Sequence, residues 1–373
     1  MTDPSEYELR AWAGVQQFET RPLSTALAQA NQRMLDSAAD LGNRASLFLK
    51  DHPKAESAFA GGHSFAAKGV RAAGTGVRKA GQAVPDPISD WSEAAFHSLR
   101  NQLGRIARAG LSPKRVVGQY KKHGHVVTRL SDIRGLDLEA IDLVRGRASS
   151  WYYPAIAALS GASAGLVITG GELAVPASAG AAAGPSGATI VAAFAGDAAF
   201  VVGLSSRSVG HIALQYGYDP EEPAEKIFLF SVINAGTAAS QAAKTAAFSD
   251  ISRLTQALVR GKAWVILDKS IVSKVVKQTA ELIGKRLTKN SLGKALPAVG
   301  IAVGSAFNWA TLEGVVDAAN IAYRRRFLLE KYPHLQVDSH FDLVMDGTDS
   351  TSGEPDDVIS VVDELRNAGG PAL

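Results

Sequence analysis

The stretch VAAFAGDAAFVVGL, residues 191–204, places one aspartate, Asp197, in the middle of a run of small and apolar residues. No lysine or arginine lies within nine positions of this carboxylate on either side. The segments 148–171 and 173–196 each contain 24 residues without a charge. Prolines and glycines between 170 and 187 interrupt this region, so the sequence predicts a helical hairpin with arms at about 154–171 and 186–216.

The rest of the chain shows helical patterns as well. No alternating pattern typical of a strand lasts more than six residues. Asp219 is a candidate N-cap with Pro220 at the first helical position. Apolar spacing predicts further helices at about 24–50, 54–82, 88–109, 113–122, 137–147, 221–245, 249–267, 270–288 and 295–332. We therefore expect an all-α multi-helix bundle around a central Gly/Ala-rich apolar hairpin.

Charge and composition divide the chain into four parts. From residue 333 onward there are nine acidic residues against Arg366 alone, a net charge of −8, so residues 1–332 carry about +11 of the total of +3. We expect an acidic tail at 333–373 that is solvated. The other expected parts are a disordered, loose leader at 1–22, a basic N-terminal helical extension at 23–129 and a helical domain at 130–332.

Composition excludes some classes of protein. The chain has no cysteine, which excludes disulfides and thiolate metal sites. The N-terminal residues lack the basic and apolar regions of a signal peptide, so we expect a cytoplasmic protein. We expect no metal, because the histidines show no ligand spacing, and no cofactor. A hydrolase is not expected either, because GASAG (161–165) lacks the preceding strand that a nucleophile elbow needs.

The apolar hairpin has the length of membrane-spanning helices but not their content. Most of its residues are Ala, Gly and Ser. The strongly lipophilic residues between 154 and 171 are only five (Ile156, Leu159, Leu166, Val167 and Ile168), and at about −0.3 to −0.6 kcal/mol each they barely offset the roughly 2.5–3.5 kcal/mol that an aspartate costs at a helix centre in a membrane. Glycines spaced four apart, at 161 and 165 and at 300 and 304, favour close helix packing. We expect a buried hairpin in a soluble or peripheral protein.

Asp197 shares one stripe of its predicted helix with Arg207 and His211. Arg207 lies about 15 Å along the axis, too far for a direct contact. Another helix must therefore supply a partner for Asp197, with Lys285 and Arg286 as candidates, or the carboxyl group is protonated. Three interpretations remain open: a structural carboxylate, a ligand or lipid head-group site at Asp197, Arg207 and His211, and an acid–base pair of Asp197 and His211.

Two segments resemble the EcsC family. AGDAAFVVGLSSRSVGHIALQYGYDPEEPAEKIF and GKRLTKNSLGKALPAVGIAVGSAFNW, with the later AYRRRF, are similar to family segments in the same order, and the likeness covers about 130–332. By this resemblance the matching residues are Asp197, Arg207, Tyr216, Gly217, Lys285, Arg286, Pro297, Gly300, Gly304 and Asn308. It implies a helical bacterial protein with glycine-rich apolar segments, a suspected link to membranes and transporters, and no established activity.

Basic residues cluster at 100–134 and 260–294, beside the uncharged segments. The YRRRF segment (323–327) is more typical of a solvated helix end, and an anion-binding role is the alternative. The candidate ligand residues are Asp197, Arg207, His211, Lys285, Arg286 and Asn308, and the candidate surface anion-binding residues are Arg115, Lys121, Lys122, Arg324, Arg325 and Arg326.

The leading hypothesis is a non-enzymatic, peripheral protein of a membrane surface or lipid, accessory to envelope or transporter processes. Its partners would be an anionic lipid surface and a membrane protein. An enzyme acting on a lipid or envelope precursor through Asp197 and His211 is the alternative. Nucleic-acid binding through the basic N-terminal half is a lower alternative and is not expected, since the segment has no recognised module.

Overall fold

The computed structural model describes residues 3–16, 111–146, 150–158, 160, 187–261, 269–292, 300–336, 358–371 and 373. Within these ranges the chain forms helices and no strand, which confirms the predicted all-α fold. The predicted helices at 24–50, 54–82 and 88–109 and most of the first hairpin arm lie outside the described residues.

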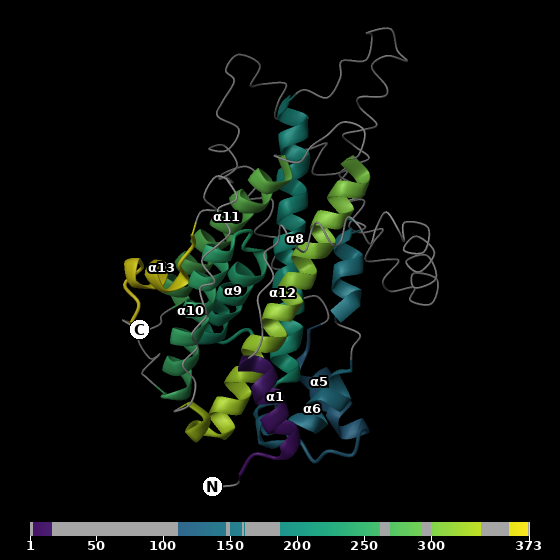
Figure 1. The fold of residues 1–373 in the computed structure, drawn as a ribbon, viewed down its shortest axis with the longest axis vertical. Coiled ribbons are helices and arrows are strands. Elements are labelled where there is room, and N and C mark those ends of the chain that lie inside the picture. The colour runs from purple at the N-terminus through teal and green to yellow at the C-terminus, as the bar shows by residue number, and fades with distance from the viewer. Residues whose placement is uncertain are drawn as a thin grey trace.

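Two long helices form the axis of the molecule. α8 (Gly187–Gln215) and α12 (Gly300–Lys331) pack against each other along the long axis of the molecule (Figure 1). α9 (Pro223–Thr237) packs against α12 and α10 (Gln241–Val259), and α11 (Lys269–Leu292) contacts both α8 and α9. The second hairpin arm is therefore a central helix, and most of its described residues from Ala198 onward are buried.

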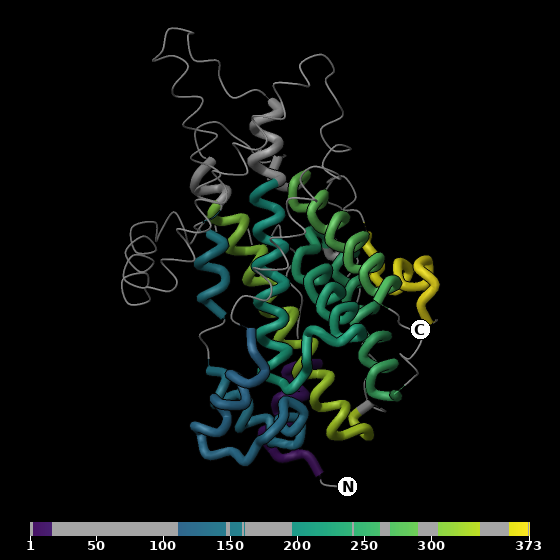
Figure 2. Tube along the Cα trace, turned by 180° about the vertical axis from the view of Figure 1, so that it is seen from behind, coloured from purple at the N-terminus to yellow at the C-terminus, as the bar shows by residue number. Residues whose placement is uncertain are grey.

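Shorter elements cover the ends of this core. α5 (Pro113–Lys122), η2 (Leu130–Gly135) and α6 (Leu138–Arg145) form a lobe at one end of α8, seen from behind in Figure 2. We call residues 111–146 the basal lobe. α1 (Glu6–Gln16) packs against α6 and α12, whereas α13 (Val361–Asn367) packs against α9, α10 and α11, away from the basal lobe in both views.

The C-terminal end of α8 turns in a Schellman motif. The Tyr218 N–H donates to the Ala213 carbonyl at 2.9 Å, and the Gly217 N–H donates to the Leu214 carbonyl at 3.0 Å. Gly217 adopts a φ of +84°, and a Cβ there would lie 2.9 Å from the Leu130 carbonyl oxygen. Glycine is required at this position both by its backbone conformation and by the contact with η2.

α9 begins later than the sequence pattern predicts. The expected N-cap Asp219 instead accepts a hydrogen bond from the Glu221 N–H at 3.0 Å, while Glu222 is the N-cap and Pro223 the first helical residue. Glu222 has a ψ of 141°, because the residue before a proline avoids helical angles. The prediction placed the helix start at the wrong proline.

The boundary between α9 and α10 also differs from the prediction, which had helices at 221–245 and 249–267. The helical backbone is interrupted at residues 238–240. There the Ser240 hydroxyl oxygen accepts a hydrogen bond from the Ala243 N–H at 3.2 Å. A serine N-cap supplies the acceptor that the first turn of α10 needs. The apolar pattern continues through this break, which explains why it predicted one helix there.

Both chain termini are more ordered than predicted. The predicted loose leader contains α1, whose Trp12 and Val15 are 6% and 1% exposed. The end of the predicted acidic tail contains α13, whose Val361 and Leu365 are fully buried. Both segments therefore bury apolar side chains against the rest of the fold.

α9 and α12 approach each other at two glycines. A Cβ on Gly236 would lie 2.4 Å from the Val315 Cα, and a Cβ on Gly314 would lie 2.8 Å from the Gly236 carbonyl oxygen. The two backbones are therefore in direct contact. The glycine pairs singled out from the sequence, at 161 and 165 and at 300 and 304, are not among the glycines whose neighbours the structure describes.

A helix that crosses a bilayer needs about 20 predominantly apolar residues. Across the described residues, none combines the length and the apolar character that crossing a bilayer requires.

Because α9 and α12 touch at Gly236, adding a single methyl group there should strongly reduce the stability of the fold. Gly236→Ala should destabilise the fold by about 1–3 kcal/mol, because the added Cβ overlaps the α12 backbone and the helices must separate. Thermal unfolding should show a melting temperature lower by about 2–4 °C for each kcal/mol. Gly196→Ala is the control: this exposed glycine of α8 has open space around its Cβ position, so alanine should be neutral or slightly stabilising. Equal effects of the two substitutions would contradict the close approach.

Candidate functional site

Asp197 lies at the contact between α8 and α12. The Asn308 amide of α12, itself 1% exposed, donates to both carboxylate oxygens at 3.0 and 2.9 Å. The Ser160 hydroxyl donates to Oδ1 at 2.8 Å. As expected, another helix supplies the partner, but within the described residues both donors are neutral, and neither Lys285 nor Arg286 is among them.

The surroundings of Asp197 favour its protonated form. Burial raises the pKa of this carboxyl group, and the hydrogen bonds from Asn308 and Ser160 offset only part of the increase. An amide and a hydroxyl stabilise a carboxylate less than a cation would. Among the described residues the printed partners of Asp197 are therefore an amide and a hydroxyl rather than a cation, and burial raises the pKa of the carboxyl group above its ordinary value.

His211 forms a second cluster farther along α8. Its Nδ1 lies 3.1 Å from the Tyr153 hydroxyl, and its Nε2 lies 3.3 Å from the Gln215 side-chain nitrogen. Burial, together with the nearby positive charge of Arg207, lowers the pKa of His211 to about 4. The imidazole is therefore neutral near pH 7 and links α8 to the helical stretch 150–158.

The structure does not bring the candidate ligand residues into one site. Asp197 and His211 are fourteen positions apart on one straight helix, about 21 Å at 1.5 Å per residue. Arg286 belongs to a third location, where its Nη1 donates to the Asn234 side-chain oxygen at 3.0 Å. Asp197 and His211 cannot act together on one reacting bond, so the geometry gives no support to the acid–base interpretation.

The three arginines of the YRRRF segment lie inside the fold. Arg325 and Arg326 are 5% and 4% exposed, which contradicts both a solvated helix end and a surface location for these two side chains. Arg326 pairs with Glu225 at 2.6 Å, and Arg324 pairs with Asp142 at 2.6 Å. α12 continues through a packed region here, and carboxylates from α9 and α6 neutralise its charge.

Aromatic rings surround this buried pair. The Arg326 guanidinium carbon lies 4.0 Å from the centre of the Tyr218 ring, and Tyr323 contacts Tyr216, Tyr218 and Phe228. The Tyr218 hydroxyl donates to Glu330 at 3.1 Å. The YGYD turn is thus a packing centre between α8, α9 and α12.

The other predicted anion-binding residues, Arg115, Lys121 and Lys122, are exposed on α5. The opposite side of α5 buries Val116, Val117 and Tyr120. The Tyr120 hydroxyl donates to the Gln215 carbonyl at 2.7 Å and so attaches α5 to the end of α8. The cations of α5 are held on the surface of a fixed helix.

Exposed apolar side chains occur near these cations. Val126, in the loop after α5, is 95% exposed, and Leu143 of α6 is 71% exposed. Trp151, which follows α6, and Leu9 of α1 are 43% and 48% exposed. Of the five exposed large hydrophobic residues among the described ones, Val126 and Leu143 belong to the basal lobe. The basal lobe therefore combines exposed cations with exposed apolar groups.

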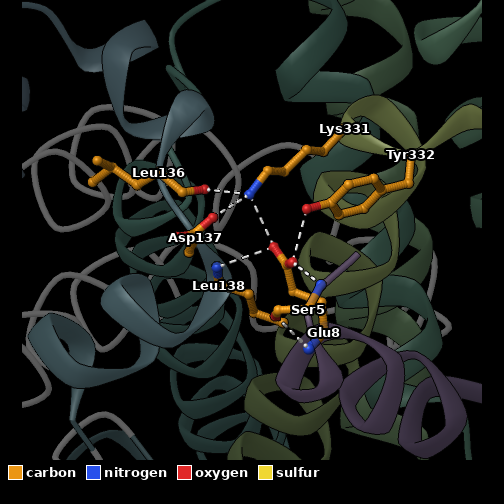
Figure 3. A network of polar contacts seen from close by, with 7 residues as sticks. All are labelled: Ser5, Glu8, Leu136, Asp137, Leu138, Lys331 and Tyr332. Carbon is orange, nitrogen blue, oxygen red and sulfur yellow. Dashed lines mark hydrogen bonds and ion pairs between the residues drawn. The ribbon is translucent and has the colours of Figure 1, made fainter. Parts of the chain in front are cut away.

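Sequence reasoning missed a polar network that attaches α1 to this lobe (Figure 3). The Glu8 carboxylate is 1% exposed and accepts hydrogen bonds from Lys331 at 2.9 Å and from the Tyr332 hydroxyl at 2.8 Å. Lys331 also contacts Asp137 at 2.8 Å and donates to the Leu136 carbonyl at 3.1 Å. Three separate parts of the chain meet at these two charges.

A local signal was available for this segment. Ser5 and Glu8 form a capping box: the Glu8 N–H donates to the Ser5 hydroxyl at 3.2 Å and the Ser5 N–H donates to the Glu8 carboxylate at 2.9 Å. The motif SEYE predicts a helix start at residue 5. Its long-range partners on α12 have no signal in the local sequence.

Within the described residues, no three His, Asp or Glu side chains are arranged to hold a metal ion.

Comparison with known proteins identifies relatives without a described activity. The model of the EcsC protein family matches residues 76–328, about two thirds of the chain. Over 139 residues, 37% of this chain, the sequence is 27% identical to "Uncharacterized protein YdbA" of Bacillus subtilis (strain 168). The alignment covers 48% of that protein, so the chain spans about half the length of the curated relative it matches. No solved structure matches. α1 and α13 lie outside the matched range, whereas Asp197 and Asn308 lie inside it.

The raised pKa of Asp197 predicts that removing its charge increases the stability of the fold, and that this increase depends on pH. The folded chain holds the proton more tightly than the unfolded chain, so this group's contribution is fully present below the unfolded pKa of about 3.9 and is lost as pH rises through the folded value. Asp197→Asn should raise the melting temperature at pH 7, by about 2–4 °C for each kcal/mol recovered, and the gain should shrink as pH falls toward 4. Asp363→Asn, an exposed control, should change little. A lower melting temperature for Asp197→Asn at pH 7 would show that the ionised form stabilises the fold.

The contribution of the Glu8 network to stability should depend on pH in the opposite direction to that of Asp197. Burial alone would raise the pKa of Glu8, but hydrogen bonds from Ser5, Lys331 and Tyr332 outweigh it and lower the pKa to about 2. Its contribution is present above the unfolded pKa of about 4.3 and is lost as pH falls toward 2. Glu8→Gln should cost on the order of 1–3 kcal/mol at pH 7, measured by denaturant unfolding, and progressively less below pH 4. Glu6→Gln, exposed in the same turn, is the control and should have no measurable effect. A pH-independent loss in Glu8→Gln would contradict a role for its charge.

Proposed function

The chain belongs to the EcsC protein family, and from this premise we propose that it is a non-enzymatic, peripheral protein that binds an anionic membrane surface through its basal lobe. The observation that carries the proposal is the exposed side of α5, which presents Lys114, Lys121 and Lys122 and is followed in the next loop by Val126, 95% exposed. Cations with a protruding apolar side chain fit a surface of anionic head groups above a hydrocarbon layer.

Electrostatic attraction would supply most of the binding energy. A lysine or arginine near an anionic membrane contributes about 1 kcal/mol, so a few cations of α5 give reversible binding of a few kcal/mol. Because the opposite side of α5 is attached to α8, these cations are presented without the cost of ordering a free segment. Val126 would add apolar contact that salt does not screen.

Other features of the chain support this proposal over the alternatives. The distance along α8 between Asp197 and His211 gives no support to an acid–base enzyme. Asp197, Asn308 and the buried arginines contact other parts of the fold, which is typical of structural roles. The basal lobe exposes lysines and apolar side chains, and its sequence has no recognised nucleic-acid-binding module, which favours a lipid surface over a sequence-specific partner.

Sedimentation with vesicles tests the proposal. The protein should sediment with vesicles of phosphatidylglycerol and phosphatidylcholine at low salt, but not with phosphatidylcholine alone. The double variant Lys121→Glu, Lys122→Glu should bind at least about tenfold more weakly, because two attractive charges become repulsive. Val126→Ser should reduce the part of the binding that persists at high salt.

Two exposed lysines of α11 provide a matched control. Lys269→Glu, Lys274→Glu makes the same change in net charge on a different face and should retain most of the binding. Equal losses in both double variants would show that net charge, not the basal lobe, is responsible. An unbound protein with both kinds of vesicle at low salt would refute the proposal, and preferential binding of duplex DNA through Lys121 and Lys122 would replace it with nucleic-acid binding.

A further inference from the structure

The C-terminal segment 358–371 packs on a surface formed by α9, α10 and α11 (Figure 1). Its apolar side chains are buried: Ile359, Val361, Val362 and Leu365 are 4%, 0%, 2% and 0% exposed. We call the part of α9, α10 and α11 that this segment covers the docking face. The docking face lies within the range matched by the family model, whereas the segment lies beyond it.

Two buried polar side chains of the docking face bind the start of this segment. Asp250 of α10, 3% exposed, accepts hydrogen bonds from the Ser360 hydroxyl at 3.0 Å and the Val362 N–H at 3.3 Å. Asn234 of α9, 1% exposed, donates to the Ile359 carbonyl at 2.8 Å. These groups contact the backbone of the segment at both a carbonyl and an N–H.

Arg286 of α11 binds the Asn234 side chain that makes this contact. Its guanidinium donates to the side-chain oxygen of Asn234 at 3.0 Å, and this orients the Asn234 amide nitrogen toward the Ile359 carbonyl. Arg286 is one of the residues by which the sequence resembles the family. A residue of the family pattern thus positions a contact to a segment that the family model does not match.

The segment has its own helix signals at both ends. Ser360 is the N-cap and accepts a hydrogen bond from the Asp363 N–H at 3.2 Å. At the other end, Gly369 adopts a φ of +88° and the Gly370 N–H donates to the Leu365 carbonyl at 2.9 Å. With only seven residues, α13 is too short to be stable as an isolated helix in water, so it gains its structure from the docking face.

We propose that the docking face is a binding site for a short, serine-capped amphipathic helix, and that residues 358–371 are its exchangeable occupant in this chain. The occupant needs apolar side chains at the positions of Val361, Val362 and Leu365 and an N-cap hydroxyl that reaches Asp250. Purely apolar packing would not require a buried carboxylate, since such a group is costly unless a partner donates to it. Asp250 and Asn234 therefore select a helix N-terminus in one register. This site is separate from the basal lobe, so it goes beyond the membrane-binding proposal.

Cleavage of the full chain between the core and α13 tests exchange. A site-specific protease sequence is introduced after Gly347, the folded protein is cut, and a fluorescent synthetic peptide of residues 356–371 is titrated onto it. The peptide should bind saturably, and excess unlabelled peptide should displace it. A Leu365→Asp peptide should bind at least about tenfold more weakly because it would bury a charge, whereas an Arg366→Ala peptide, changed at an exposed position, should bind equally.

The register is tested by a double-mutant cycle. Ser360→Ala in the peptide should lower its affinity for the protein. This loss of affinity should largely disappear when the protein carries Asp250→Ala, since the two side chains bind each other. Independent losses would refute the proposed recognition by Asp250. Failure of the peptide to bind a cut protein that keeps its helical circular dichroism would refute the site itself.

Hydrogen exchange on the uncut chain covers the case in which cleavage unfolds the protein. Amides of 361–367 should exchange through a local opening that needs less free energy than the opening of α9, because the segment can leave while the core remains folded. If the amides of 361–367 and those of α9 both exchanged at the rate of global unfolding, α13 would be an inseparable part of the core. That result would overturn the proposal.

Discussion

The direct contact between the backbones of α9 and α12 at Gly236 and Gly314 determines where the rest of this fold can lie. Two helices that touch at glycines have little freedom in distance or rotation, because any side chain would separate them. This contact sets the path of the C-terminal half of α12. Along that path lie Arg324, Arg326 and Lys331, each of which meets a carboxylate from a different element. The packing of two neutral residues thus organises the buried charges of the molecule.

The buried pairs explain how a basic chain distributes its charge. Asp142 of α6, Glu225 of α9 and Glu8 of α1 neutralise cations on one helix, so α12 holds the ends of the fold together and contributes little positive surface. The cations without such burial lie mainly on α5 and α11. A pair formed inside the fold is costly to break, whereas an exposed cation remains available to an external anion. The buried basic residues therefore have structural partners inside the fold, and the membrane-binding proposal concerns the exposed ones.

Local signals account for what could be predicted from the sequence. The uncharged runs predicted α8 almost to its ends, and the isolation of Asp197 correctly indicated a partner from another helix. Ser5, Ser240 and Pro223 carried cap signals for α1, α10 and α9 that the apolar pattern alone overlooked. The burial of Arg326 and the partners of Glu8 could not be predicted in this way, since they depend on contacts between residues far apart in the chain. A run of arginines looks the same on a surface and in a core.

Segments outside the family range attach to the core at two distant places, and the attachments differ in kind. α1 is held by an ion pair between Glu8 and Lys331 that also involves α6, so it fastens the basal lobe to α12. α13 is held by apolar side chains and by hydrogen bonds to its backbone, which involve no ion pair with the core among the described residues. Salt and pH act strongly on charged contacts and weakly on apolar ones. The attachment of α1 to the basal lobe therefore depends in part on charge, whereas the proposed exchange of α13 takes place on the surface of α9, α10 and α11.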